Sequence, residues 1–235
     1  MKSLATYITE KMIYTKSNTN NIKYDYHPET KEELKDIIDK LVDEQSMEDV
    51  IDLNSIDTFE ITDMSGLFHK FEGILKIDVS KWDVSNVDNM DSMFKGCINL
   101  EEIIGIEKWD VSNVENMEDM FYECKLFNQD ISKWNMSKVT NISGIFYRCY
   151  EFNKPLNDWD VSNVKDMLSV FCECKKFNQP LDKWDVSNTT DMSSMFFNCK
   201  SFNQDISKWN VSNVTDNDII FENCPIEKKY KPKFK

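Results

Sequence analysis

Residues 181–202 read LDKWDVSNTTDMSSMFFNCKSF, and this stretch decides the fold because the chain repeats it. The tryptophans of the sequence recur at intervals of 27, 25, 25, 25 and 25 residues. A phenylalanine follows each tryptophan by 12 residues, and a cysteine follows it by 15. Self-similarity at such a period predicts a repeat architecture, in which each unit buries its apolar side against its neighbours. The tryptophan column consists of Trp82, Trp109, Trp134, Trp159, Trp184 and Trp209.

The pattern inside one repeat predicts its local structure. Trp184 and Val186 alternate with polar residues, a period of two that indicates a short half-buried strand. Met192, Met195 and Phe196 follow at helical spacing and predict about two turns of helix, with a threonine or aspartate at its N-cap. A degenerate unit precedes the first tryptophan, so we expect an α/β repeat of about seven turns, each a short strand plus a short helix.

The remaining segments are expected to close or extend this array, which runs over residues 50–225. Residues 1–29 are polar and predict a loose arm, or a partner-binding segment that orders on contact. Residues 30–49 contain a capping-box pattern followed by an apolar stripe, which predicts a capping helix over residues 31–45. Residues 226–235 form a basic tail, interpreted as a solvated end, with contact to an acidic partner or nucleic acid as the alternative.

Composition argues against several classes of protein. The formal net charge is -14, and arginine occurs once, at Arg148, so we do not expect direct binding to nucleic acid. The histidines, His27 and His69, lie outside the repeats, and Gly-rich phosphate loops are absent. We therefore expect no enzyme, no catalytic residue and no cofactor. There is no apolar run long enough for a membrane span and no signal-peptide pattern, so a cytoplasmic location is expected.

The cysteine column invites a metal or disulfide interpretation, but we favour a structural one. Cysteine packs well as a small buried residue, and the C-x-x-C pairs or histidines of zinc sites are missing, so no metal is expected. Cys172 lies outside the column, two residues before Cys174. On a helix these two would face different directions, so we expect Cys172 to be exposed and to be the readily reacting thiol.

The repeat resembles a known family. FNQDISKWNVSNVTD at residues 202–216 and the MFxxCxxF pattern at residues 195–202 resemble the BspA-type leucine-rich-repeat surface proteins, whose repeat also occurs in mycoplasma lipoproteins as a domain of unknown function. The resemblance covers about three quarters of the chain. It implies a right-handed solenoid with a binding role, a concave strand face and a cell-surface location, and it implies no reaction.

The residues flanking each tryptophan are the candidate binding site. In a half-buried strand they point outward, forming a lysine column and an aspartate column that are expected to offset each other's charge. This outer surface, called the charged face below, is interpreted either as a solvated ladder or as the site that holds a protein partner. Its residues are Lys81, Asp83, Lys108, Asp110, Lys133, Asn135, Asp158, Asp160, Lys183, Asp185, Lys208 and Asn210.

Two functional hypotheses of different kinds follow. The first is a non-catalytic protein-interaction solenoid that binds another protein through the charged face. The second is an acidic cytosolic inhibitor, phage or mobile-element encoded, that occludes a basic nucleic-acid-binding protein and is therefore sensitive to salt. Bacterial surface adhesion, implied by the resemblance, is a third hypothesis. A homodimer is compatible with the sequence but nothing in it requires one.

Overall fold

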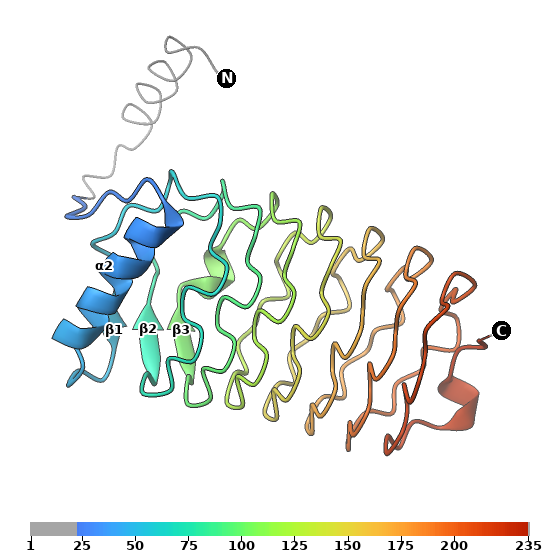
Figure 1. Ribbon diagram of the computed structural model, residues 1–235. Coiled ribbons are helices and arrows are strands. Elements are labelled where there is room, and N and C mark those ends of the chain that lie inside the picture. The colour runs from blue at the N-terminus through green and yellow to red at the C-terminus, as the bar shows by residue number, and fades with distance from the viewer. Residues whose placement is uncertain (1–22, 235) are drawn as a thin grey trace, which may run out of the picture.

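The computed structural model describes residues 23–234 of the 235-residue chain. Successive repeats lie side by side as the coils of one elongated stack (Figure 1). The helix α2, Lys31–Glu44, lies at one end of the stack, and the C-terminus lies at the other. Isolated parallel bridges join each repeat to the next at the residue seven after the tryptophan, beginning with Asn89 and Asn116. The repeats therefore stack in register, one period apart.

The regular strands occupy the N-terminal part of the stack. β1 (Ile51–Asp52), β2 (Lys76–Asp78) and β3 (Glu102–Ile104) form a parallel sheet in the order β1-β2-β3. The Gln129 side chain continues the sheet beyond β3, since its amide donates to the Ile103 carbonyl at 3.1 Å and accepts from the Ile103 N–H at 2.7 Å. A side-chain amide thus occupies the place of a fourth strand.

The dominant backbone feature is a set of tight turns that we call the turn ladder. It covers the segment equivalent to residues 191–198 in every repeat. Alternate residues of this segment donate their N–H groups to carbonyls of the following repeat, with four such bonds of 2.7–3.2 Å at each of the six junctions. At the last junction the donors are Met192, Ser194, Phe196 and Asn198. In every one of these bonds the earlier repeat donates and the following repeat accepts.

The turn ladder replaces the short helix that the sequence predicts in each repeat, so that prediction is wrong. Two residues of each ladder segment have left-handed backbone angles, for example Ser194 at φ 58° and Asn198 at φ 57°. Such residues cannot continue an α-helix. The aspartate expected as an N-cap, Asp191, instead accepts a hydrogen bond from the Ser193 N–H at 2.8 Å and forms an Asx turn. The apolar side chains at helical spacing are nevertheless buried, because consecutive turns also bring them to one side.

The strand predicted around each tryptophan is also absent as a regular strand. Residues 182–183 and 187–188 form turns, and the regular strands lie elsewhere. The predicted alternation of burial is present, with Trp184 and Val186 buried and Lys183 and Asp185 exposed. Hydrogen bonds to the side chains of neighbouring repeats replace a continuous backbone ladder here, so the period of two does not require a strand.

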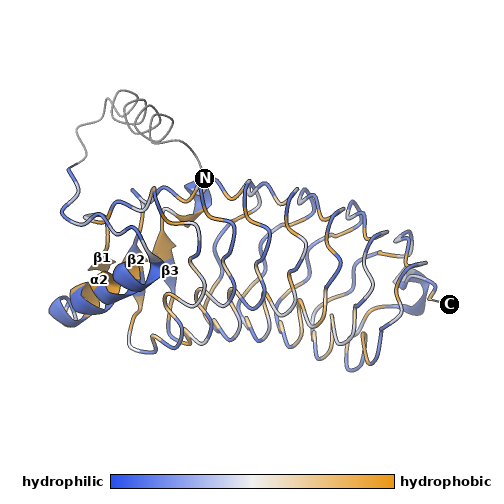
Figure 2. Cartoon of the chain, turned by 45° about the horizontal axis from the view of Figure 1, so that its top comes forward, coloured by the Kyte–Doolittle hydropathy of each residue, from blue (hydrophilic) through white to orange (hydrophobic). Residues whose placement is uncertain are grey.

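Stacked aromatic side chains form the core. Each tryptophan is at most 6% exposed, and Trp82, Trp109 and Trp134 stack in sequence with centroids 6.4 Å apart. The phenylalanine column stacks in the same way, with 5.9 Å between Phe121 and Phe146. Figure 2 shows hydrophobic and hydrophilic segments alternating along the coils. The predicted interior columns are confirmed in the repeats before the last, whereas Phe221 and Cys224 of the last repeat are only partly buried.

The N-terminal end is covered by α2, close to the bounds predicted. The Thr30 side chain caps the helix by accepting from the Glu33 N–H at 3.2 Å. Leu34 and Ile38 are completely buried against the first repeat. Of the predicted polar arm, residues 23–29 attach to the stack through a bridge between Tyr26 and Ile56. The rest of that arm lies outside the described residues.

The basic tail is packed onto the last repeat, which corrects the prediction of a solvated end. It contains the short 3-10 helix η2 (Lys228–Tyr230). The Tyr230 carbonyl accepts from the Ile206 N–H at 3.0 Å, and the Ile226 side chain is 5% exposed. The Lys231 ammonium lies 4.9 Å from the centroid of the Phe221 ring. The apolar residues spaced among the lysines explain this docking, because each covers part of the last coil.

Candidate functional site

The charged face is exposed, as the sequence predicts. Of its twelve residues only Asp83 is half-buried, and the other eleven are exposed. Each lies next to a tryptophan whose ring is fixed in the core, and most of these rings are held by a hydrogen bond. The Trp184 indole N–H donates to the Leu156 carbonyl of the preceding repeat at 2.8 Å. The face is thus presented by a backbone that the buried tryptophans hold in place.

The aspartate column of the charged face also organises the backbone. In each repeat the aspartate or asparagine side chain accepts from the N–H of the serine two residues on, at 3.0–3.2 Å. The side chain of Ser187, and next its backbone N–H, lower the pKa of Asp185 by hydrogen bonding to its carboxylate. A lowered pKa stabilises the fold above the ordinary pKa of the group, and this stabilisation is lost as the pH falls through the folded value. Asn135 and Asn210 make the same bond, so the turn requires the oxygen and not the charge.

The lysine column is less uniform. Lys108, Lys133 and Lys208 are exposed, and an aspartate, Asp158, replaces lysine in the fourth tryptophan repeat. Lys183 donates to Asp158 at 2.7 Å, and this contact lowers the pKa of the Asp158 carboxyl. Because both side chains are well exposed, the pair contributes little to stability. Lys108, Lys133 and Lys208 therefore lie exposed on the charged face.

An asparagine column beside the charged face was missed by sequence reasoning. Four residues after the tryptophan, the asparagine side-chain amide donates to a main-chain carbonyl of the preceding repeat at 2.6–2.8 Å. Asparagine stands at this position in five of the six tryptophan repeats, with Lys138 in the other, and this recurrence is the signal that could have revealed the column. The donors are Asn86, Asn113, Asn163, Asn188 and Asn213.

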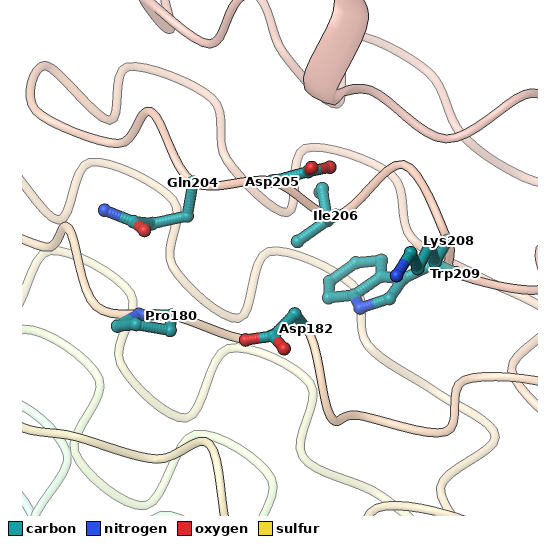
Figure 3. A pocket seen from close by; sticks show the side chains of 7 residues that line it. All are labelled: Pro180, Asp182, Gln204, Asp205, Ile206, Lys208 and Trp209. Atoms are coloured by element: carbon teal, nitrogen blue, oxygen red, sulfur yellow. The ribbon is translucent and has the colours of Figure 1, made fainter.

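A shallow pocket lies at the C-terminal end of the charged face (Figure 3). Two adjacent repeats line it: Pro180 and Asp182 belong to one, and Lys208 and Trp209 to the next. In Figure 3 the Lys208 side chain lies beside the Trp209 ring. The lining of the pocket therefore includes a lysine of the charged face and a tryptophan of the core.

Arg148 forms a second polar cluster, in the turn ladder. Its guanidinium bridges Glu123 at 2.7 Å and Glu173 at 3.3 Å, one repeat to either side. The Tyr147 ring stacks on the Tyr122 ring with 4.3 Å between centroids. These contacts tie three successive repeats together at the surface.

The cysteine column is structural, as expected, but Cys172 is not exposed. Thiols of the column donate to phenylalanine carbonyls of the preceding repeat, for example Cys174 to Phe146 at 2.9 Å. Cys172 is only 4% exposed, and burial raises its pKa to about 12. The prediction of an exposed thiol fails because the segment is not a helix. Cys172 instead occupies the ladder position that Tyr147 and Phe197 hold in the adjacent repeats.

A test of thiol reactivity follows from this correction. Cys224 is half-buried, so we expect it to be alkylated first in the native protein, whereas Cys172 should react only on unfolding. Mass spectrometry after brief maleimide treatment at pH 8 would locate the adducts. The Cys224→Ser variant should lose the fast phase and Cys172→Ser should retain it. A fast phase that disappears with Cys172→Ser would contradict the observed packing.

Comparison with known families identifies the repeat. The family model described as "Mycoplasma protein of unknown function, DUF285" matches residues 36–149 and again residues 127–232. The chain belongs to this family. Both DUF285 matches include repeats with the charged face, and the second extends into the packed tail. No curated protein matches the chain.

Two further observations concern the described part of this DUF285 chain. Across residues 23–234, no group of three or more histidine, cysteine, aspartate or glutamate side chains is arranged to hold a metal ion. Nor does a helix in that range have the length and apolar character needed to cross a membrane.

Proposed function

We propose that this protein is a non-catalytic binding module that holds another protein through the charged face. The observation that carries the proposal is the arrangement of the exposed residues. A lysine precedes the tryptophan in five of the six tryptophan repeats, and an aspartate or asparagine follows it in all six. The tryptophans are buried, and all of these neighbours except the half-buried Asp83 are exposed. A charged outer surface that recurs on successive repeats suits an extended partner, which can contact several repeats at once.

The proposed architecture for this role is a right-handed, leucine-rich-repeat-like solenoid of the BspA type. Support comes from the parallel bridges between repeats and from the interior columns. In this proposal the charged face is the concave one. The pocket beside Lys208 and Trp209 would receive one side chain of the partner at the end of the contact surface.

The test removes charge from the face without disturbing its turns. Asp110→Asn, Asp160→Asn and Asp185→Asn together keep the Asx turns, because Asn135 and Asn210 already form them. We expect about a tenfold loss of affinity for a co-purified partner, since each exposed ion pair contributes about 0.2–1 kcal/mol. Quantitative co-purification followed by titration calorimetry would measure the loss.

The matched control removes three acidic charges outside the face. Asp36→Asn, Glu48→Gln and Glu60→Gln change the net charge by the same amount at exposed positions. This control should bind like the unmodified chain. Equal losses in both variants would contradict the charged face as the site and would support a long-range electrostatic effect instead.

The salt dependence of the affinity distinguishes the acidic-inhibitor hypothesis from the binding module. Its supporting observation is the net charge of -14, which attracts any strongly basic partner. An inhibitor of this kind should lose affinity steeply between 50 and 200 mM salt, in the range typical of phosphate-mimicking contacts. A partner whose affinity falls only moderately with salt, and is lost in the Asp→Asn variant, favours the binding module.

A further inference from the structure

The open end of the turn ladder carries an unpaired row of main-chain donors. In every earlier repeat the alternate N–H groups of the ladder bond to carbonyls of the next coil. Within the described residues, the tail that follows the last repeat does not form another coil of the ladder. Within residues 23–234, the N–H groups of Asn217, Ile219, Phe221 and Asn223 have no hydrogen-bond partner. We call this row the end edge.

The end edge has a single polarity, because every bond of the ladder points the same way along the stack. In an ordinary sheet edge, donors and acceptors alternate, so that the strand dipoles nearly cancel. Here the edge consists of donors alone, which gives it a positive partial charge.

Apolar side chains accompany the end edge and are less covered than their equivalents. Val214 and Phe221 are only partly buried, whereas Val164 and Phe171 at the same positions of an inner repeat are completely buried. Ile219 is 50% exposed. The packed tail contacts the Phe221 ring through Lys231 but leaves this part of the coil open.

Ile219 is also an unusual residue for its position. Its φ is 49°, in the left-handed region that a β-branched residue rarely adopts. Glycine or a polar residue holds this position in the other repeats, for example Gly144 at φ 62° and Ser194 at φ 58°. An exposed, strained isoleucine next to four unpaired donors is difficult to explain by the stability of the isolated chain alone.

A second copy of this chain does not fit the end edge. Tail-to-tail contact would place donors against donors. Head-to-tail contact would need an open first repeat, but α2 covers that end and Met64 and Leu67 are completely buried. A small anion is disfavoured too, because the exposed carboxylates of Asp218 and Glu222 belong to the same coil.

We propose that the end edge binds an extended segment of another protein, which adds a further layer to the stack. The main-chain carbonyls of this segment accept from the four free N–H groups, and an apolar side chain covers Ile219. Such strand addition obtains its affinity from main-chain bonds and its specificity from side-chain contacts. This site is separate from the charged face and does not depend on its function.

The probe is a peptide with the sequence of residues 191–202, carrying serine in place of cysteine. In the chain, the carbonyls of Asp191, Ser193, Met195 and Phe197 accept the ladder bonds of the preceding repeat, so the peptide can supply the missing layer. Hydrogen exchange measured by NMR reports on each amide. In the free protein, the four end-edge amides should exchange much faster than the Phe196 amide.

Saturating peptide should slow exchange of the four amides at least about tenfold, and a scrambled peptide should not. Ile219→Ser should weaken the binding of the peptide, because the apolar contact is lost, without lowering the melting temperature, because serine occurs at this position in other repeats. Unchanged exchange with the ladder peptide would overturn the proposal. Equal protection by inorganic phosphate would also overturn it, and would assign an anion site.

Discussion

Replacing Trp134 with alanine is expected to lower the free energy of unfolding by about 3–5 kcal/mol, the range measured when large aromatic side chains are removed from protein cores. Trp134 is 4% exposed and stacks on Trp109 with centroids 6.4 Å apart. Its indole N–H donates to the Ile106 carbonyl at 3.0 Å. The substitution therefore creates a cavity and leaves a buried carbonyl without this donor. Urea unfolding followed by circular dichroism would measure the change.

A matched pair of variants separates packing from hydrogen bonding. Trp109 occupies the same position one repeat earlier, but its buried indole N–H has no partner. Trp134→Phe loses a hydrogen bond, whereas Trp109→Phe removes an unsatisfied donor. We expect Trp134→Phe to be the more destabilising by about 1–2 kcal/mol. Equal effects would show that the hydrogen bond contributes nothing beyond packing.

Replacing Gly105 with alanine is expected to destabilise the fold by about 2–4 kcal/mol, combining overpacking with left-handed strain. Gly105 has φ 97° and precedes the 3-10 helix η1, Ile106–Lys108, in the repeat that is two residues longer. An added Cβ would lie 2.3 Å from the Ser80 Cα atom. The obstacle is backbone of the neighbouring coil, which cannot rotate away.

Gly66→Ala is the control for Gly105→Ala. Gly66 also has a positive φ, 65°, but no atom lies within 4 Å of its added Cβ. It should cost only the strain of a left-handed alanine, about 1 kcal/mol. Thermal unfolding of both variants would compare them. Similar losses in the two would indicate that the close approach of the coils at Ser80 is not rigid.

The sequence predicts which residues are buried far better than it predicts the backbone that buries them. The same residue type at the same position of each repeat indicates the same surroundings in each repeat. The burial of the tryptophan, phenylalanine and cysteine columns can therefore be predicted from residue type alone. The same spacing of Met192, Met195 and Phe196 is compatible with a helix and with consecutive turns. What distinguishes them is the left-handed backbone at Ser194 and Asn198, and these residue types carry only a weak signal for it.

The exposure of the charged face could be predicted for the same reason. The hydrogen bonds that its side chains make within the chain could not. Polar residues next to a buried tryptophan must point outward when burial alternates. The Asx turns of Asp185 and its equivalents depend on the local backbone, which the predicted strand did not contain. The docked tail was missed because its lysines dominate the composition, whereas Ile226 and Tyr230 determine its contacts.

Amine-labelling footprints of the chain, taken with its natural partner bound and again after the partner is removed, test the central claim most directly. The account predicts that Lys108, Lys133 and Lys208 of the charged face are protected in the complex. Lys175 and Lys200, which follow the cysteine column, should label equally in both states. Protection of Lys175 and Lys200 with full labelling of the charged face would contradict the account.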